Sequence, residues 1–368
     1  MALAIYRKYR PKNFDDLIGQ QVVTQILKSA ASQNKIAHAY LLAGPRGTGK
    51  TTAARLIAKV ANCETRRKDE KFLALGEPCN DCRICSEINE GRALDIVEID
   101  AASNRGIDEI RNLKESVRLS PTSYYQKVFI IDEAHMLTKE AFNALLKVME
   151  EPPNEVILIL ATTELDKIPP TIVSRTQRFH FKRASLQEIL NKLNKIIKTE
   201  KIKADKDALE LIAAAAEGSF RDAEALLEQM AHFSSGSIAL ENVEKIIGKT
   251  GNAKIAAFAE SLLKNNLQES LALLNQIQEG GYNISQFCKD LIHCLRRVLV
   301  LKLEPKIEAY FSEELTSTEL ANLKKMAKLV KEEKHIDLLK NLINAYGQIR
   351  YSPFPIIPLE VAIVESLK

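Results

Sequence analysis

The feature that most restricts the fold of this chain is a glycine-rich run between an apolar segment and a helix-forming one. Residues 39–43 are apolar, residues 44–51 read Gly-Pro-Arg-Gly-Thr-Gly-Lys-Thr, and residues 52–61 favour a helix. The glycines allow consecutive backbone N–H groups to turn toward one anion without Cβ clashes, and the following helix directs its positive end toward the same charge. A strand, such a loop and a helix in this order predict an α/β domain that binds nucleotide phosphates.

Two residues of the run have specific chemistry. Lys50 is expected to bridge the β- and γ-phosphates, and Thr51 to place its hydroxyl on Mg²⁺. The alternative is a glycine-rich turn with nothing bound, which the preceding strand and following helix disfavour. The residues of this stretch predicted to contact ATP or Mg²⁺ are Gly44, Pro45, Arg46, Gly47, Thr48, Gly49, Lys50, Thr51 and Thr52.

A second apolar run, residues 128–131, ends in two carboxylates, Asp132 and Glu133. A buried strand that ends so presents them at the carboxyl edge of the sheet, where ligands bind in open α/β sheets. Asp132 is predicted to hold Mg²⁺, directly or through water, and Glu133 to polarise the attacking water. The alternative is a solvated acidic turn, which the upstream phosphate loop makes less attractive.

The apolar runs also predict the fold class. Runs at 39–43, 94–99, 128–131 and 156–161 are separated by helical sequence. Short β-branched runs spaced in this way indicate a mostly parallel sheet with helices on both faces.

From Ser185 onward the apolar residues recur at helical spacing, and at 368 residues the chain is long enough for two or three domains. We expect an α/β domain over 1–184, a small helical domain over 185–248 and a helical C-terminal domain over 249–368. The last of these should contain helices at 253–263, 267–277 and 284–301.

Three further positions suggest hydrolysis as well as binding. Thr162 and Thr163 directly follow the run at 156–161, so their hydroxyls could orient water or sense the γ-phosphate. Arg175 follows a rigid Pro-Pro loop, and Arg221 lies where Gly218 and the next residues open a helix. Taken singly, each arginine is more simply interpreted as a surface residue.

Four of the six cysteines fall within one short stretch, with the spacing Cys63-x15-Cys79-x2-Cys82-x2-Cys85. Four thiolates this close suit a closed tetrahedral Zn²⁺ site with a structural role. The alternative is four free thiols in a reducing compartment. Cys288 and Cys294 follow a helical apolar pattern and are interpreted as core thiols.

Charge and hydropathy limit how this chain can contact DNA and where in the cell it is expected. The net charge of +4 is mild, so any contact with DNA should be local or shared among subunits. The first residues turn basic and aromatic too early for a signal peptide, and no run is long enough to span a membrane. We expect a cytoplasmic protein.

Seven motifs recur in one order along the chain: Tyr9-Arg10-Pro11, Phe14 to Gln20, Gly44 to Thr51, Asp132 to His135, Ala161 to Thr163, Ser174-Arg175 and Gly218 to Ala223. In order and spacing they resemble those of bacterial clamp-loader gamma/tau subunits, which are AAA+ ATPases. The resemblance is strong over the first 250 residues and looser, through domain order and length, over the rest.

The resemblance implies roles for residues on each side of the nucleotide. Thr163 would be the first sensor of the γ-phosphate, and Arg221 the second, reaching it from a helical lid. Arg10 and Pro11 would line the adenine side.

Arg175 resembles the family's arginine finger, which acts on the ATP of the neighbouring subunit. Thr176 departs from the family pattern, which usually has Cys at this position; because that Cys carries no charge to the transition state, little loss is expected. The family also carries a similar four-Cys insertion after the phosphate-loop helix.

The resemblance further implies a task. A ring of such subunits opens the sliding clamp, places it on primer–template DNA and hydrolyses ATP, as part of the DNA polymerase III holoenzyme. The C-terminal domain would form the collar of a pentamer with other clamp-loader subunits. Asn104, Arg105 and Lys139 are predicted to contact DNA, the alternative being solvated side chains. No polymerase active site is evident in the sequence.

Two other functions stay open at this point. One is a different AAA+ machine, such as a branch-migration helicase motor, which the four-Cys insertion disfavours. The other is a non-catalytic assembly protein, which the intact Lys50, Asp132, Glu133 and Arg221 disfavour.

Overall fold

The structure is a computed structural model that describes residues 4–103, 116–117, 119–233, 236–247, 251–315, 317–349 and 351–368. It contains two compact units. The first comprises Met1–Glu188 with Gly218–Ala225, and the second Ile189–Glu217 with Leu226–Lys368. Among the described residues, no helix combines the length and apolarity that crossing a membrane requires.

The centre of the first unit is a parallel sheet. Within the described residues it has five strands in the order β2-β3-β4-β1-β5. Every neighbouring pair is parallel, which confirms the predicted sheet type. The strands are β1 (Ala39–Ala43), β2 (Ile96–Asp100), β3 (Lys127–Asp132), β4 (Val156–Thr162) and β5 (Gln177–His180).

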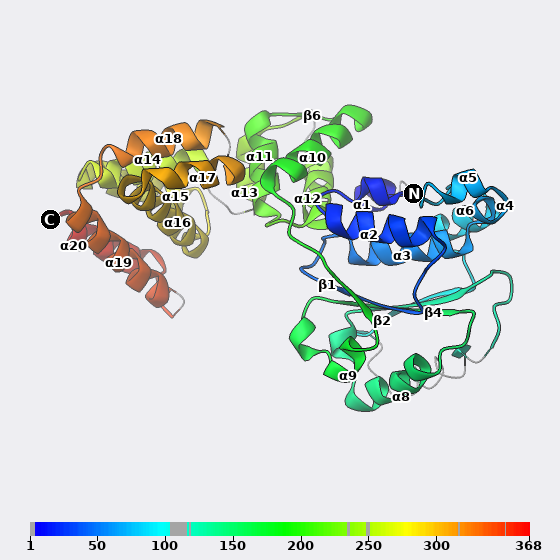
Figure 1. Ribbon diagram of the computed structural model, residues 1–368. Helices are drawn as coiled ribbons and strands as arrows, with labels where there is room; N and C mark the ends of the chain where they lie inside the picture. Colours follow the sequence, from blue (N-terminus) through cyan, green and yellow to red (C-terminus); the bar gives the residue numbers. More distant parts are fainter. Residues whose placement is uncertain are drawn as a thin grey trace. The chain divides into compact units, whose positions relative to one another are not determined.

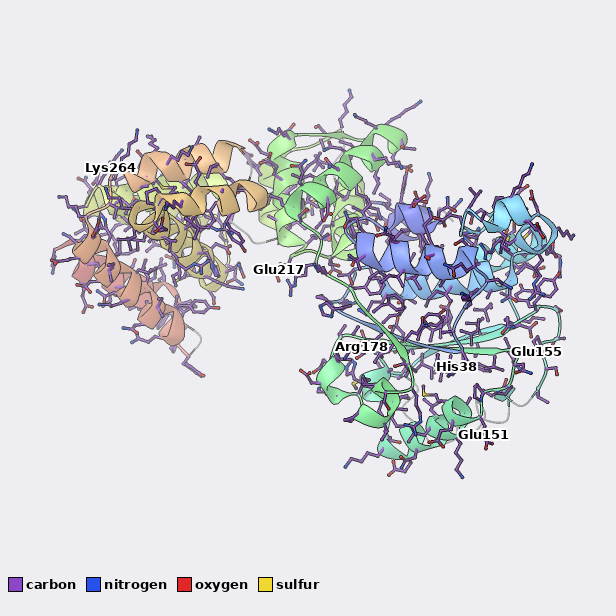
Figure 2. The ribbon with its side chains drawn as sticks, in the orientation of Figure 1. His38, Glu151, Glu155, Arg178, Glu217 and Lys264 are labelled. Carbon is purple, nitrogen blue, oxygen red and sulfur yellow. The ribbon has the colours of Figure 1, made fainter. Side chains whose placement is uncertain are left out.

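Two strands differ from the sequence expectation. β2 begins at Ile96, two residues later than predicted, because Leu94 is 77% exposed and lies outside the sheet. β5 was not predicted at all. It is a short edge strand in which only Phe179 is buried, and Arg178, labelled in Figure 2, is exposed. Such a polar segment gives almost no apolar signal.

Helices cover both faces of the sheet, as Figure 1 shows, with α2 and α3 on one face and α8 and α9 on the other. Val128 and Ile130 pack toward α3, whereas Phe129 and Ile131 pack toward α8, because successive residues of a strand point to opposite faces. This two-sided burial explains why β3 reads as a continuous apolar run.

The helices of the first unit precede and follow these strands. They are α1 (Ile5–Lys8), η1 (Phe14–Asp16), α2 (Gln21–Ser32), α3 (Lys50–Asn62), α4 (Glu64–Lys68), α5 (Glu70–Leu73), α6 (Arg83–Glu90), η2 (Ala134–Met136), α8 (Lys139–Glu150), η3 (Leu165–Lys167) and α9 (Pro170–Val173).

The second unit is almost entirely helical, apart from a short parallel pair, β6 (Lys203–Ala204) and β7 (Ser237–Ile238). Two of its helices, α10 and α12, also contribute residues to the first unit. The helices are α10 (Leu186–Glu200), α11 (Lys206–Ala215), α12 (Phe220–Phe233), α13 (Leu240–Ile247), α14 (Asn252–Leu263), α15 (Leu267–Glu279), α16 (Ile284–Leu303), η4 (Pro305–Ile307), α17 (Glu308–Glu314), α18 (Ser317–Ala327), α19 (Glu332–Ile349) and α20 (Ile356–Leu367).

A single apolar core extends through α14 to α20. Phe258 and Phe287 meet edge to face at its centre, with ring centroids 5.1 Å apart. Cys288 is fully buried in this core and Cys294 packs against it, so both are core thiols as predicted. The helical C-terminal region is thereby confirmed, while the boundaries of the three predicted domains stay predictions.

Candidate nucleotide site and cysteine cluster

The glycine-rich run is a tight loop between β1 and α3. Gly44 has φ 149°, and a Cβ there would lie 2.3 Å from the carbonyl oxygen of Phe181. Gly47 has φ 72°, and its Cβ would lie 1.9 Å from Ser219 Oγ. Both positions therefore need glycine for space as well as for conformation. α3 begins at Lys50, two residues before the predicted start, so Lys50 and Thr51 lie in its first turn.

The ammonium group of Lys50 lies over this loop. Lys50 is 6% exposed, and its Nζ donates to the carbonyl oxygens of Gly44 and Pro45, each at 2.8 Å. Burial lowers the pKa of Lys50, and the charges of Asp132 and Glu133 oppose that shift. A buried cation whose hydrogen bonds, among the described residues, go to neutral carbonyls has an electrostatic preference for an anionic partner.

Asp132 lies at the carboxyl end of β3 and faces the start of α3. Its Oδ2 accepts a hydrogen bond from Thr51 Oγ1 at 2.7 Å, which joins residues 81 positions apart. Oδ1 accepts from the backbone N–H of Glu133 at 3.0 Å. A hydroxyl and a carboxylate side by side are the hard oxygen ligands that Mg²⁺ prefers.

Glu133 is held by the neighbouring strand. It has φ 48°, an uncommon left-handed conformation for a residue other than glycine. Thr163 Oγ1 donates to Glu133 Oε2 at 3.1 Å. Strained backbone at the end of a central strand is typical of functional positions.

His135 completes this edge, and sequence reasoning gave it no role. Its Nδ1 lies 3.1 Å from Thr162 Oγ1 and 3.5 Å from Glu133 Oε2. Its Nε2 lies 3.3 Å from Glu164 Oε1. The signal that could have indicated it is its position two residues after Glu133, on the turn that carries the acids.

The start of α12 reaches the glycine-rich loop within the first unit. The backbone N–H of Phe220 donates to Gly47 O at 3.2 Å. Arg221 follows, with its guanidinium 5.2 Å from the ring centroid of Tyr6. Tyr6 was not predicted, because a tyrosine in a basic N-terminal stretch has no distinguishing pattern.

The remaining loop and N-terminal residues vary in burial. Thr48 is buried and its hydroxyl donates to Pro45 O at 2.8 Å. Arg46 is exposed, and Thr52 and Pro11 are half-buried. Arg10 is also half-buried; burial lowers its pKa, and the nearby charge of Arg55 lowers it further.

Arg175 lies apart from the loop. Its guanidinium donates to Glu150 Oε1 at 2.8 Å and to Thr171 O at 3.0 Å. Both partners belong to the α8 and α9 side of the sheet. The side chain is 36% exposed. Its own chain therefore does not bring it to Lys50 or Asp132.

Of the three predicted DNA contacts, one can be located. Lys139 is exposed and is the first residue of α8. Asn104 and Arg105 lie outside the described residues.

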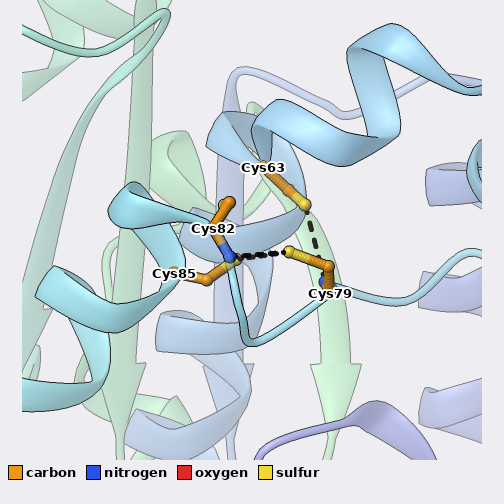
Figure 3. A group of neighbouring side chains, drawn as sticks. All are labelled: Cys63, Cys79, Cys82 and Cys85. Atoms are coloured by element: carbon orange, nitrogen blue, oxygen red, sulfur yellow. Dashed lines mark hydrogen bonds between the residues drawn. The ribbon is translucent and has the colours of Figure 1, made fainter.

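The four cysteines converge from the end of α3, the loop between α5 and α6, and the start of α6 (Figure 3). Their sulfur atoms all lie within 4.8 Å of one another. Tetrahedral Zn²⁺ with thiolate ligands requires sulfur–sulfur distances of about 3.8 Å, so only a small adjustment is needed. The residues present therefore fit a closed Zn²⁺ site. They are Cys63, Cys79, Cys82 and Cys85.

Hydrogen bonds prepare this cluster for thiolates. Cys79 Sγ accepts from the backbone N–H of Cys82 at 3.2 Å and of Asp81 at 3.4 Å. The hydrogen bond from the Cys85 thiol lowers the pKa of Cys63, against the opposing effect of burial, and the same contact raises the pKa of Cys85.

Three consecutive stretches of the chain match known protein families. Residues 19–185 match the family described as DNA polymerase III, delta subunit. Residues 188–236 match the DNA polymerase III clamp loader subunit, ATPase lid domain, and residues 238–367 match DNA polymerase III subunits gamma and tau domain III.

Curated relatives match nearly the whole chain. The DNA polymerase III subunit tau of Bacillus subtilis is 41% identical over 98% of this chain and 62% of its own length. The corresponding tau subunit of Escherichia coli is 34% identical over 98% of this chain and 54% of its own. The gamma subunit of Buchnera aphidicola subsp. Acyrthosiphon pisum is 34% identical over 98% of this chain and 97% of its own. The chain thus spans little more than half of the tau relatives and nearly all of this gamma relative.

A solved structure, the Bacillus subtilis DNA clamp loader delta protein (YqeN), aligns with 93% of this chain and 99% of its own, with 13% identity and a TM-score of 0.40. A score this low supports neither fold nor function by itself.

Proposed function

The chain belongs to the gamma/tau subunit family of DNA polymerase III, and from this premise we propose that it is the ATP-hydrolysing motor subunit of a bacterial clamp loader. In this role it opens the sliding clamp and places it on primer–template DNA within the polymerase III holoenzyme, without a polymerase site of its own. Several matched relatives are longer than this chain, so the activity, the substrates and the partners are all part of the proposal.

The observation that carries the proposal is the contact between Thr51 and Asp132. It places the end of the phosphate loop and the end of β3 at one edge of the sheet, within hydrogen-bond distance. Lys50 lies beside them with its ammonium over the loop. Mg²⁺ bound by the hydroxyl and the carboxylate would neutralise charge on the β- and γ-phosphates. A structural turn would have no need to bury a lysine there.

Hydrolysis requires a base for the attacking water, and the proposal assigns this role to Glu133. Its carboxylate has one oxygen hydrogen-bonded to Thr163, which fixes its orientation. The other oxygen is able to accept a proton from water. Thr163 then has the sensor role, because its hydroxyl joins the base to the strand next to the phosphates.

Two arginines couple the site to motion and to a neighbour. Arg221 enters from α12, and Phe220 next to it is hydrogen-bonded to the phosphate loop. Loss of the γ-phosphate would thus change the position that the lid prefers. Arg175 acts in trans, on the ATP of the adjacent subunit. Its ion pair with Glu150 orients it on its own chain until a neighbour is present.

The cofactors of this proposal are ATP, Mg²⁺ and structural Zn²⁺. Zinc would crosslink the end of α3 to α6 and supply no catalysis, because four cysteines leave no open position. Within the proposal the ATPase domain is 1–184, the lid 185–248 and the collar 249–368, and the location is cytoplasmic.

The collar assignment is supported by apolar side chains that the second unit leaves exposed at its end. Tyr351 is 89% exposed and Phe354 is 65% exposed, between α19 and α20. Ile357 and Val361 on α20 are each 48% exposed. Several large apolar groups in one short stretch are typical of a subunit interface.

The proposed DNA contacts are Lys139, Asn104 and Arg105. They would bind backbone phosphates, so DNA binding should weaken as the salt concentration rises.

The decisive experiment is the ATPase rate of the chain assembled with the other loader subunits, with and without clamp and primer–template DNA. We expect stimulation only when both are present. Equal rates with and without them would argue for a different AAA+ machine, and no turnover at all would argue for a non-catalytic assembly protein.

A variant of the proposed arginine finger, Arg175, tests the hydrolysis mechanism more directly. Arg175→Ala should leave ATP binding nearly unchanged and reduce stimulated turnover by about 10³-fold or more, because such an arginine stabilises the transition state of phosphoryl transfer. Glu150→Ala, which removes the ion-pair partner, is the control and should keep most of the turnover. Full turnover in Arg175→Ala would remove the finger assignment.

A further inference from the structure

The cysteine-bearing insertion, residues 63–91, makes direct contact with the chain segment that precedes α2. We call these the metal module and the N-terminal segment, residues 10–17. Glu77 accepts hydrogen bonds from the backbone N–H of Phe14 at 2.8 Å and of Asp15 at 3.1 Å. Asn80 donates to Asn13 Oδ1 at 2.6 Å. Glu77 and Asn80 lie on either side of the predicted zinc ligand Cys79. The metal module therefore holds three consecutive residues of the N-terminal segment, 13–15.

Lys59, near the end of α3, joins the same parts. It is 2% exposed, and its Nζ donates to Lys12 O at 2.9 Å, to Asn89 Oδ1 at 2.9 Å and to Asn80 Oδ1. An ammonium has three N–H donors, and all three are used. A single buried cation thus connects the phosphate-loop helix, the N-terminal segment and two residues of the metal module.

The metal itself would strengthen this arrangement. Four thiolates around a divalent ion have a net charge of −2, which is costly to bury without counter-charges. Lys59 and Arg66, 2% and 3% exposed, supply two positive charges beside the cysteines. Arg66 also donates to Ala31 O at 2.7 Å and to Val60 O at 3.0 Å, so it ties α2 and α3 to the module.

The other side of the N-terminal segment touches the nucleotide site. Leu17 is 6% exposed, and its Cδ2 would be 3.4 Å from a Cβ on Gly49 of the phosphate loop. Phe14 is fully buried. Arg10 and Pro11, assigned to the adenine side, directly precede the residue that Lys59 holds. The segment therefore lies between the metal module and the site.

We propose that the metal module is a brace for the base-binding end of the nucleotide site. With metal bound, Glu77, Asn80 and Lys59 fix residues 12–15 and so position Arg10 and Pro11 against the nucleotide. Without metal the loop around Cys79 is no longer fixed by its ligand. The site then binds the base of the nucleotide more weakly, while its binding of the phosphates is unchanged. This inference rests on the proposed function, because it assigns ATP to the loop and adenine to the segment.

The test compares two glutamates of the metal module in the full, zinc-loaded chain. Glu77→Gln removes one acceptor from the N-terminal segment but leaves all four cysteines in place. Glu90→Gln is the matched control, because Glu90 is 52% exposed and pairs with Arg92. Metal content, amide hydrogen exchange of residues 12–17, and equilibrium binding of ATP and of inorganic tripolyphosphate are measured for each.

For Glu77→Gln we expect unchanged zinc content and amide exchange at residues 13–15 faster by about tenfold or more. ATP binding should weaken by about 3- to 10-fold, while tripolyphosphate binding stays the same, because only the base end is loosened. Glu90→Gln should match the wild type in all four measurements. Removing zinc with a chelator should reproduce the pattern of Glu77→Gln, and added zinc should reverse it.

Wild-type exchange and ATP affinity in Glu77→Gln would overturn the brace, and so would an equal loss of ATP and tripolyphosphate binding. If chelation unfolds the chain, the Glu77→Gln arm still decides. Failure of the proposed function is distinct, because the unaltered chain would then bind neither ligand. In that case the exchange measurements still test whether Glu77 holds the segment.

Discussion

Helix α3 buries a lysine near each end, and the two lysines are used in opposite ways. Lys50 is its first residue and Lys59 lies nine positions later, about 14 Å along the axis. Lys50 donates to two carbonyl oxygens of the loop that carries it. Lys59 donates to oxygens from Lys12, Asn80 and Asn89, which are 47, 21 and 30 positions away.

The difference separates a cation that can exchange partners from one that cannot. The hydrogen bonds of Lys50 are local, so a phosphate oxygen can replace a carbonyl without moving another element. Those of Lys59 join three distant parts of the chain, so each is needed for the fold. Buried lysines are rare in either case. The partners therefore indicate whether such a group serves binding or structure.

The largest expected effect is on binding at the first of these ends. Lys50→Ala should weaken ATP binding by about 100-fold or more, because two or more hydrogen bonds from a charged donor to phosphate are lost. The free energy of unfolding should change little, since only loop carbonyls lose a donor. Equilibrium binding of a fluorescent ATP analogue and urea unfolding followed by circular dichroism measure the two effects. ATP affinity close to that of the wild type would contradict the assignment of the loop.

The second end should show the reverse pattern. Lys59→Met should lower the free energy of unfolding of the zinc-loaded chain by about 2 kcal/mol, because three oxygens from separate parts of the chain lose their charged donor. ATP affinity should fall only severalfold, through the N-terminal segment. Lys71→Met, at an exposed position in the same module, is the control and should change neither quantity. If Lys59→Met were as stable as this control, the contrast between the two lysines would be wrong.

The same contrast explains which parts could be predicted from sequence. Lys50 and Thr51 belong to one contiguous motif, and Asp132 ends a continuous apolar strand, so local patterns reveal them. The parallel sheet, the helical C-terminal region and the cysteine cluster were predicted for the same reason. The structure brings Thr51 to Asp132 and Thr163 to Glu133, as the predicted sheet edge requires, while their catalytic roles stay predictions.

The contacts of Lys59, Glu77 and Asn80 could not be predicted in this way. Each joins residues far apart in sequence, through single polar side chains that follow no period. Tyr6 below Arg221 was missed for the same reason. β5 was missed because an edge strand with polar side chains has neither an apolar run nor strict alternation.

Another buried basic group, in the second unit, tests how far the contrast extends. His335 lies in the first turn of α19 and is 2% exposed. Its Nδ1 accepts from the backbone N–H of Lys331 at 2.9 Å, and within the part of the chain that the structure describes its Nε2 has no hydrogen-bond partner. An accepting Nδ1 and an unpartnered Nε2 suit a neutral ring. Unlike the two lysines, this group is buried without charge.

The smallest predicted effect follows from that neutrality. Burial lowers the pKa of His335, and the charges of Lys334 and Lys331 lower it further. The unfolded chain, with an ordinary histidine pKa of about 6.5, therefore binds the proton more readily, so stability is fully present above that pH and falls as the pH drops below it. The free energy of unfolding should fall between pH 7 and 5.5, and His335→Gln should remove that part of the slope. Amide hydrogen exchange of α19, followed from pH 7 to 5.5, measures this loss of stability. His232→Gln, at an exposed histidine of α12, is the control. If both variants kept the wild-type pH dependence, His335 would not be buried as a neutral ring, and the distinction would apply to α3 alone.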